Sequence, residues 1–414
     1  MAKQNKPAIR FKGFTDAWEQ RKLSEIAGKV TEKNTGLQYV ETLTNSAEFG
    51  IISQRDFFDH DISKLGSLDG YYIVRNEDFV YNPRISTSAP VGPINRNKLG
   101  RTGVMSPLYT VFRPHDIDTT YLEHFFKCGY WYSFMNFNGD SGARSDRFSI
   151  KDDVFFQMPI PVPHIEEQRK IGLFLTQLDH LITLHQRKYD KLQVLKKAML
   201  EKMFPKNGSS VPEIRFKGFT DAWEQRKLGE VVERITRKNE NLESTLPLTI
   251  SAQYGLINQN EFFDKRIASK DVSGYFLVRN GEFAYNKSTS SDAPWGAIKR
   301  LDRYESGVLS TLYIVFKISD ERKTSSDYIV TYYNTDLWHK GIQAIAAEGA
   351  RNHGLLNVAP ADFFETNLTM PKDYAEQQQI GSFFQQLDHL ITLHQRELEK
   401  LQNIKKSMLE KMFV

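Results

Sequence analysis

Cysteine is almost absent from this sequence, since Cys128 is the only one among 414 residues. A single cysteine cannot form a disulfide within the chain, and no group of Cys and His residues has the spacing of a zinc site. The opening residues MAKQNKPAIRFKGF lack the apolar core and the cleavage site of a signal peptide. No run approaches the roughly 18 uncharged apolar residues of a membrane span. We therefore expect a cytoplasmic protein without a structural metal.

Motifs of catalysis are also missing. No glycine-rich loop ends in Gly-Lys-Ser/Thr, which a nucleotide-driven motor needs to cradle phosphates. The letters YNPR at 81–84 and DAPW at 292–295 come closest to the signature of amino-methyltransferases, but each lacks the second adjacent proline, so we interpret both as turns. No Pro-Asp is followed by the Asp/Glu-x-Lys of metal-dependent nucleases. We expect no catalytic, cofactor-binding or metal-binding residue in this chain.

The composition is typical of a globular protein, with 40% hydrophobic, 12% aromatic and 26% charged residues. A chain of 414 residues exceeds the size at which a single hydrophobic core usually stops growing, which predicts two or more domains. The net charge of +4 permits a polyanionic partner but is too small to require one.

The most informative feature is an internal repeat. Residues Ile9 to Leu23 read IRFKGFTDAWEQRKL, and Ile214 to Leu228 read the same letters. Weaker similarity follows, for example between GYYIVRNEDFVYN at 70–82 and GYFLVRNGEFAYN at 274–286. Near identity returns in LDHLITLHQR at 178–187 and 387–396, and each copy then reaches LEKMF. Near-identical ends predict a shared structural or docking role, whereas divergent middles predict different contacts.

Each copy ends in a segment with the apolar spacing of a long helix. From Glu166 to Met203 apolar side chains recur at steps of three and four, which indicates a coiled-coil seam. Such a helix is about 57 Å long and is unstable unless its stripe is covered, so we expect the two copies to pack together. The seam positions are Ile171, Leu175, Leu178, Ile182, Tyr189, Leu192, Met199 and Met203 in the first copy, and Ile380, Phe384, Leu387, Ile391, Leu398, Leu401, Met408 and Met412 in the second, with Lys196 and Lys405 also on the seam.

Two histidines, His185 and His394, also occupy seam positions. They could form a metal site or a pH switch, but without Cys or carboxylate neighbours on the same face, hydrogen-bonded core residues are the favoured interpretation. Between the copies, PKNGSSVPE at 205–213 has the composition of a linker.

The middles of the two copies are rich in strand signals. Strand candidates in the first copy are YYIVRNEDFVYN, LYTVF and FFQMPIPVP, separated by turn residues. The segments from Tyr121 to Met135 and from Tyr328 to Ile345 have helical apolar spacing, so we expect one internal helix in each lobe. A mixed α+β lobe follows from these patterns.

The divergent loops contain side chains suited to DNA. Arg can read guanine and Asn or Gln can read adenine, while Lys, Ser and Thr contact the phosphate backbone. The alternative is that Asn, Ser and Thr gather in loops simply because they make turns. In the first lobe the candidate DNA-binding residues are Gln54, Arg55, Asn82, Arg84, Ser86, Thr87, Ser88, Arg144, Ser145 and Arg147. In the second lobe they are Gln253, Gln259, Asn286, Lys287, Ser288, Thr289, Ser290, Arg351, Asn352 and His353.

The duplicated order of variable lobe and long helix resembles the specificity subunits of type I restriction-modification enzymes, a family often called HsdS. The helix starts EEQRKIG at 166–172 and AEQQQIG at 375–381, with the repeated LDHLITLHQR and LEKMF, carry the resemblance, which covers essentially the whole chain. It implies a non-catalytic subunit with two target-recognition domains that read a split, asymmetric DNA sequence. It also implies partners, namely two adenine-N6 methyltransferase subunits that use S-adenosylmethionine and two translocating nuclease (restriction) subunits that use ATP and Mg²⁺.

The resemblance gives an α+β fold with a pseudo-two-fold internal repeat, in which two tandem mixed α/β target-recognition domains are separated by two long helices that form an antiparallel coiled coil. Two other hypotheses stay open, a duplicated coiled-coil adaptor without DNA specificity and an unrecognised DNA-modifying enzyme. The expected boundaries are a repeat segment at 1–23, a target-recognition domain at 24–164, a spacer helix at 165–204, a linker and second repeat segment at 205–228, a second target-recognition domain at 229–374 and a spacer helix at 375–414.

Overall fold

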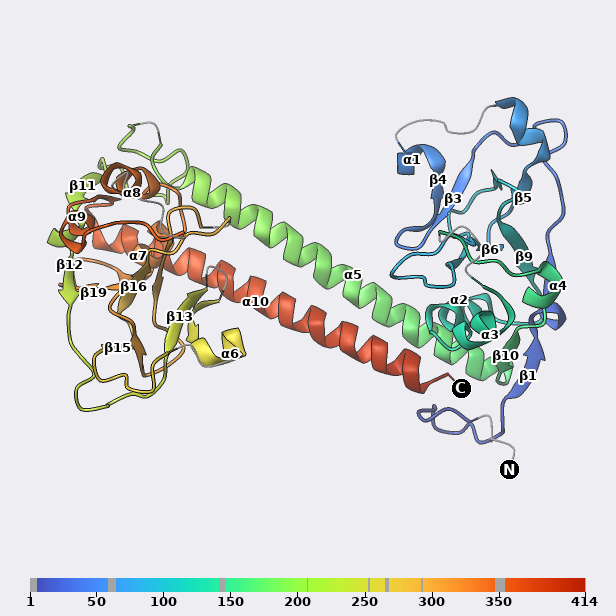
Figure 1. Cartoon of the computed structure of the whole chain (residues 1–414). Coiled ribbons are helices and arrows are strands. Elements are labelled where there is room, and N and C mark those ends of the chain that lie inside the picture. Colours follow the sequence, from blue (N-terminus) through green and yellow to red (C-terminus); the bar gives the residue numbers. More distant parts are fainter. Residues whose placement is uncertain are drawn as a thin grey trace. The chain divides into compact units, whose positions relative to one another are not determined.

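The computed structural model describes residues 6–58, 65–140, 146–206, 208–251, 254–264, 268–291, 293–346 and 354–413. The chain divides into two compact units. Unit 1 consists of residues 1–187 together with 395–414, and unit 2 consists of residues 188–394. Each unit therefore contains one lobe, the start of the long helix that follows this lobe, and the end of the other copy's long helix (Figure 1).

Unit 1 is built from short strands and short helices that precede the long helix α5, coloured blue to teal in Figure 1. Its strands are β1 (Glu19–Lys22), β2 (Ala27–Lys29), β3 (Leu43–Ser46), β4 (Gly50–Ser53), β5 (Tyr72–Val74), β6 (Phe79–Tyr81), β7 (Ile94–Arg96), β8 (Gly103–Met105), β9 (Thr110–Pro114) and β10 (Pro159–Val162). Its short helices are α1 (Gln54–Phe58), α2 (Thr119–Lys127), α3 (Tyr132–Asn138) and α4 (Asp152–Phe155), with 3₁₀ turns η1 (Leu23–Glu25) and η2 (Leu65–Gly70).

Unit 2 repeats this series. Its strands are β11 (Glu224–Lys227), β12 (Val232–Ile235), β13 (Leu248–Ser251), β14 (Gly255–Asn258), β15 (Phe276–Arg279), β16 (Phe283–Asn286), β17 (Ala297–Arg300), β18 (Ser306–Leu309), β19 (Ile314–Ile318) and β20 (Asn367–Met370). Its short helices are α6 (Gln259–Phe263), α7 (Ser326–Tyr332), α8 (His339–Ile345) and α9 (Pro360–Phe364), with the 3₁₀ turn η3 (Leu228–Glu230).

Both units have the same sheet topology. Among the described residues, unit 1 has a four-stranded antiparallel sheet in the order β2-β9-β6-β7, and unit 2 has one in the order β12-β19-β16-β17. The two-stranded pairs β1-β10, β3-β4 and β5-β8 correspond to β11-β20, β13-β14 and β15-β18. The predicted α+β class with an internal repeat is confirmed.

Stacked aromatic side chains hold the four-stranded sheets together. Phe79 on β6 is paired with Phe112 on β9, and their ring centroids are 5.5 Å apart. In unit 2 the equivalent rings of Phe283 and Phe316 are 5.3 Å apart. All four side chains are buried, so these pairs form the centre of each lobe's core.

The two long helices are α5 (Ile165–Lys202) and α10 (Tyr374–Lys411). Each ends at a lysine, short of the expected 204 and 414, because the Met-Phe that follows turns into a hydrophobic core. In unit 1 the Phe413 ring lies 5.4 Å from Tyr121, and in unit 2 the Phe204 ring lies 5.9 Å from Tyr328. Each core is thus completed by the end of the other copy's helix. Within each unit, one helix contributes its first part and the other its last part, which is the pairing of an antiparallel coiled coil.

The repeated segment at 9–23 anchors the start of the long helix. The Arg10 guanidinium makes two hydrogen bonds to the buried Glu167 carboxylate, of 2.6 and 2.8 Å. Arg215 and Glu376 form the same pair with the same two distances. The identical letters of the two segments therefore reflect an identical structural role.

The prediction of one internal helix in each lobe is wrong, because the structure has two short helices in each of these segments. In unit 1, α2 and α3 are separated by an extended Cys128, and the Trp131 indole donates a hydrogen bond of 3.1 Å to the Phe126 carbonyl. In unit 2, the Thr335 hydroxyl donates to the Tyr332 carbonyl at 2.6 Å, between α7 and α8. In both units a side-chain donor therefore binds a carbonyl group at the end of the first helix, where the regular helical hydrogen bonds stop. No helix in the described part of the chain is both long and apolar enough to cross a membrane.

Candidate nucleic-acid interface

A hollow of about 410 Å³ in unit 1 gathers most of the described residues that the sequence indicated for the first lobe. It lies where α1, the β3-β4 hairpin and the loop after β6 meet. Six of the ten candidates line it, namely Gln54, Asn82, Arg84, Ser86, Ser88 and Arg147. We call this site the unit 1 hollow. Its other lining residues are Thr44, Asn45, Ser46, Ala47, Glu48, Phe57, Phe58, Pro83, Ile85, Pro93, Leu108 and Tyr109.

Two extended segments place a pair of arginines in this hollow. The Phe148 N–H donates to the Pro83 carbonyl at 2.7 Å, and the Ile85 N–H donates to the Asp146 carbonyl at 3.0 Å. Arg84 and Arg147 lie opposite each other in this short ladder. Two cations side by side repel each other unless an anion lies between them, so the arrangement favours a negatively charged ligand.

The two arginines differ in their surroundings. The Arg84 side chain is 68% exposed and reaches Asp146 only at 3.9 Å, which makes a weak ion pair. Arg147 is half-buried, and within the described residues its guanidinium makes no hydrogen bond or ion pair. Both side chains are therefore available to a ligand, Arg84 at the rim and Arg147 deeper.

Asn82 has a structural role in the loop after β6. Its amide nitrogen donates to the Asn45 carbonyl at 2.7 Å, and its amide oxygen accepts from the Arg84 N–H at 3.0 Å. Both ends of the side chain therefore hold the loop, as in a turn. Ser86 likewise accepts from the Ala89 N–H at 3.2 Å, although Ser86, Thr87 and Ser88 all remain exposed.

Gln54 and Arg55 begin helix α1. The Gln54 N–H donates to the Thr42 carbonyl at 2.8 Å, which fixes the start of the helix against the strand before it. Gln54 is half-buried beside the hollow, and Arg55 is exposed on the helix surface.

The equivalent loop of unit 2 carries different side chains on the same backbone frame. Ser288 pairs with Leu355 in the position that Arg84 and Arg147 occupy in unit 1. The Asn286 amide oxygen accepts from the Ser288 N–H at 3.0 Å, so Asn286 shapes a turn as Asn82 does. The Thr289 hydroxyl donates to the Gly354 carbonyl at 2.9 Å.

Three further candidates of unit 2 lie close to this loop or on α6. Burial lowers the pKa of Lys287, whose side chain is half-exposed. Ser290 is exposed and pairs with Ala293. Gln259 begins α6 as Gln54 begins α1, and its buried amide oxygen has no hydrogen-bond partner among the described residues. Six candidates lie outside the described residues, namely Arg144, Ser145, Gln253, Arg351, Asn352 and His353.

Sequence reasoning missed several residues that line the unit 1 hollow, among them Glu48, Phe57, Phe58 and Tyr109. Glu48 precedes Phe49 and Gly50, just as the candidate Gln253 precedes Tyr254 and Gly255, so an alignment of the two copies could have indicated it. The aromatic residues were overlooked because apolar side chains in strand-rich segments are normally assigned to a core.

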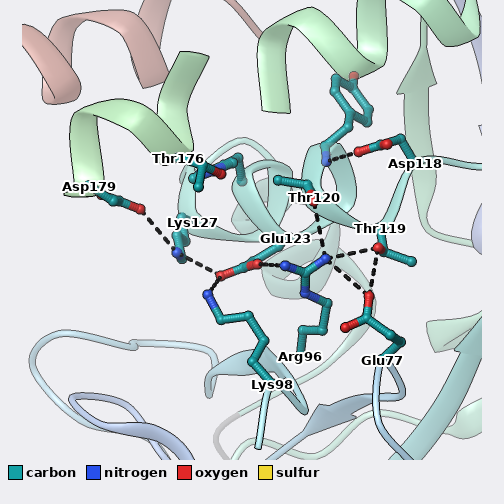
Figure 2. Close-up of polar contacts among 12 residues, drawn as sticks. Glu77, Arg96, Lys98, Asp118, Thr119, Thr120, Glu123, Lys127, Thr176 and Asp179 are labelled. Atoms are coloured by element: carbon teal, nitrogen blue, oxygen red, sulfur yellow. Dashed lines mark hydrogen bonds and ion pairs between the residues drawn. The ribbon is translucent and has the colours of Figure 1, made fainter. Parts of the chain in front are cut away.

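A network of ion pairs and hydrogen bonds in unit 1 connects β7, α2 and α5 (Figure 2). Arg96 donates to Glu123 at 2.7 Å and to Thr119 at 2.8 Å. Burial alone would raise the pKa of Glu123, but Lys127, Lys98 and Arg96 lower it to about 2. Lys127 also lies 3.5 Å from Asp179 on α5, so the network connects the lobe to the long helix.

The neighbouring His124 is buried beside Thr176. Burial lowers the pKa of His124 to about 4, with a further contribution from Lys127, so the ring is neutral at neutral pH. In the parts of the chain that the structure describes, no group of three or more His, Cys, Asp or Glu residues is arranged to hold a metal ion.

Known proteins match part of this chain in sequence and nearly all of it in fold. A family model described as the type I restriction modification DNA specificity domain matches residues 15–194. The chain resembles the type I restriction-modification S subunit from M. genitalium with a TM-score of 0.60 and 12% identity over 99% of both chains. The HsdS subunit from Thermoanaerobacter tengcongensis matches at a TM-score of 0.43 and 14% identity, over 96% of both chains. Residues 15–194 therefore match the type I restriction modification DNA specificity domain, and the likeness to the S subunit from M. genitalium shows a shared fold over nearly the whole chain.

Proposed function

We propose that each unit reads one half of a bipartite, asymmetric DNA sequence. The observation that supports this most directly is the pair of equivalent loops, where Arg84 and Arg147 in unit 1 correspond to Ser288 and Leu355 in unit 2. One backbone frame presents two cations in one unit and two uncharged side chains in the other. Two readers of the same fold but different chemistry favour two different half-sites.

The side chains of the unit 1 hollow and of the equivalent loop in unit 2 determine what kind of contact each can make. In unit 1, a guanidinium can donate two hydrogen bonds to the O6 and N7 of guanine or can neutralise a phosphate. In unit 2, the exposed Ser288 and Ser290 and the half-exposed Lys287 offer hydrogen bonds and one charge. We expect phosphate contacts to supply most of the affinity and the contacts to base edges to supply the specificity.

The same proposal includes the partner subunits. Two methyltransferase subunits would bring S-adenosylmethionine, and two restriction subunits would bring ATP and Mg²⁺, so this chain would be inactive alone. Support for two copies of one partner comes from leucines that stay exposed at identical positions of the two long helices. They are Leu181 and Leu184 on α5, and Leu390 and Leu393 on α10.

Methylome sequencing of cells that carry this chain and its methyltransferase partner tests the proposal. We expect N6-methyladenine in a split motif with two unlike halves. Replacing residues 24–164 by the chain's own 229–374 should convert the target into two inverted copies of the second half-site. A change in both half-sites would contradict independent reading.

Two biochemical controls address the other hypotheses. DNA affinity that does not fall with salt would favour the adaptor hypothesis, because phosphate contacts release counterions and make affinity salt-dependent. Purified chain supplied with S-adenosylmethionine, ATP and Mg²⁺ should neither methylate nor cleave DNA. Turnover by the chain alone would instead favour a DNA-modifying enzyme.

A further inference from the structure

Aromatic side chains are exposed at the same place in both units. In unit 1, Phe49 lies at the tip of the β3-β4 hairpin and is 60% exposed, and Phe57 on α1 is 40% exposed. Their ring centroids are 6.4 Å apart, and Phe57 in turn lies 4.6 Å from Phe58, edge to face in both cases. We call Phe49, Phe57 and Phe58 the aromatic tip of unit 1.

Unit 2 has the same feature. Tyr254 ends the turn of the β13-β14 hairpin and is 54% exposed. On α6, Phe262 and Phe263 are exposed as well, with ring centroids 4.9 Å apart. Tyr254, Phe262 and Phe263 form the aromatic tip of unit 2.

Exposing a group of aromatic rings to water is unfavourable in free energy. Their exposure in both units therefore indicates a contact surface. In unit 1 the neighbours indicate what the partner is. Phe57 and Phe58 line the same hollow as Arg84 and Arg147, two cations without a strong internal partner. Aromatic rings beside cations that lack a strong partner match the chemistry of DNA, in which flat bases lie beside phosphates.

The aromatic residues occur at equivalent positions of both units, whereas the two arginines occur in unit 1 alone. Arg84 corresponds to Ser288 and Arg147 to Leu355, whereas each aromatic position stays aromatic in the other unit. A side chain that differs between the lobes can distinguish bases. A side-chain type that both lobes share must make the same kind of contact at two different half-sites. Stacking meets this requirement, because every base has a flat face.

The hairpin that carries Phe49 is rigidly mounted. The buried Asn45 amide donates to the Val80 carbonyl at 2.7 Å and accepts from the Asn95 amide at 2.7 Å. At the tip, the Ser46 hydroxyl accepts from the Phe49 N–H at 3.3 Å, and Ser251 does the same for Tyr254 at 3.2 Å. The ring is therefore held in place before it meets DNA, which lowers the entropy cost of binding.

We propose that each aromatic tip is a wedge that inserts at a base step of its half-site. The Phe49 or Tyr254 ring stacks on a partly unstacked base, and the local kink that results brings the groove edges onto the polar side chains of the hollow. This inference rests on the proposed function, because it requires each unit to bind one half-site. It assigns to the aromatic tips a contact that is independent of base identity.

The test uses the complex of the full chain with its methyltransferase subunits and a duplex that contains the methylome-derived target. 2-Aminopurine is placed in turn at each position except the methylated adenine, since its fluorescence rises when a base unstacks. We expect a rise at one step in each half-site. Phe49→Ala should abolish the rise in the first half-site alone and Tyr254→Ala in the second alone, and each should lower affinity about tenfold or more without changing the methylated motif.

Phe49→Trp should restore the signal, because it keeps a ring at the tip. Phe137→Ala is the matched control, since Phe137 is an exposed phenylalanine of unit 1 that lies on α3 and not on the hairpin. Equal thermal unfolding of all variants excludes a folding defect. The inference is overturned if the wild-type complex shows no unstacked step, if Phe49→Ala alters base preference, or if Phe137→Ala has an equal effect. Failure of the wild-type complex to bind its target would instead refute the proposed function.

Discussion

Lys405 on α10 donates a hydrogen bond to Asp179 on α5, and the Lys405 Nζ and Asp179 Oδ1 atoms are 2.5 Å apart. Both side chains belong to unit 1, and the same pair recurs in unit 2 as Lys196 with Asp388, also at 2.5 Å. The lysines that interrupt the apolar seam are therefore each matched by an aspartate of the other helix. A polar pair in a coiled-coil seam favours the one register that satisfies it, so these pairs fix how α5 and α10 align.

A charge-reversal experiment should show this coupling. Lys405→Glu places two carboxylates together and should destabilise unit 1 by about 1 to 2 kcal/mol. Adding Asp179→Lys should recover part of this loss, and only part, because Lys127 stays within 3.5 Å of position 179. Urea unfolding of the four proteins of the cycle measures the coupling energy. Strictly additive effects would show that the pair does not interact across the seam.

The Glu123 network should make unit 1 sensitive to acid. The pKa of Glu123 lies at about 2, below its ordinary value of 4.5, so its stabilisation is complete above pH 4.5 and disappears as the pH falls toward 2. The difference corresponds to about 3 kcal/mol. Glu123→Gln should lower stability at neutral pH and flatten its dependence on pH in that window. Glu41→Gln, which removes a surface partner of Arg101, is the control and should have little effect. An unchanged pH profile in Glu123→Gln would contradict the assignment.

Gly381 allows α10 to pack closely on the start of α7. A Cβ atom at this position would lie 2.7 Å from the Cβ of Asp327 and 2.8 Å from the Tyr328 nitrogen. Gly381→Ala should therefore destabilise unit 2 by about 1 to 3 kcal/mol. Gly172→Ala should cost less, because the nearest atom, the Tyr121 nitrogen, is 3.0 Å away. Gly28→Ala meets nothing within 4 Å and serves as the control in thermal unfolding. A Gly381→Ala protein as stable as the Gly28→Ala protein would show that the contact can relax.

The two arginines of the unit 1 hollow should act differently. Arg84 lies at the exposed rim, so Arg84→Ala should weaken binding to all sequences alike and reduce the slope of log K against log salt by about one. Arg147 is deeper, so Arg147→Ala should relax one base preference in the first half-site at a cost of about 1 to 3 kcal/mol. Ser288→Ala is the counterpart in unit 2 and should affect the second half-site alone. Salt titrations of DNA binding on a panel of single-base variants of the target distinguish these outcomes. Identical binding profiles for the two arginine variants would show that Arg84 and Arg147 do not have different roles.

The fold was largely predictable from the sequence because its main signals are strong. Fifteen identical letters define the repeat, and apolar steps of three and four define the long helices. The sequence could not tell which lobe each helix end serves, because LEKMF is the same in both copies. Only tertiary packing shows that Phe413 belongs to the core of unit 1 and Phe204 to that of unit 2.

The candidate site was less predictable, because one residue type can serve two purposes. Asn82 and Asn286 have the chemistry to read adenine, yet each uses its side chain to shape a turn. Phe49 and Phe57 look like core residues in the sequence and are exposed in the structure. Whether the remaining candidates contact bases or phosphates stays a prediction, since side-chain identity without a docking geometry gives no code.

The length of the paired helices should determine the separation of the half-sites. Helix α5 passes from unit 1 to unit 2 after Arg187, and α10 returns near the equivalent Arg396. Inserting four residues after each of these arginines adds about one helical turn, or 6 Å, and rotates the following segment by about 40°. Both seam pairs lie outside the insertions, so Lys405 keeps Asp179 and Lys196 keeps Asp388. At about 3.4 Å per base pair, the unread spacer of the target should grow by one or two base pairs.

Methylome sequencing measures this directly, and the recognised bases should not change because no lobe residue has been altered. The matched control inserts the same four residues in α5 alone. That change moves Lys196 away from Asp388 and withdraws Phe204 from the core of unit 2, so we expect a loss of folding and of methylation and not a longer spacer. An active double-insertion variant with an unchanged spacer would show that the helices do not set the distance. An active variant with new half-sites would show that the helices influence base reading within the lobes.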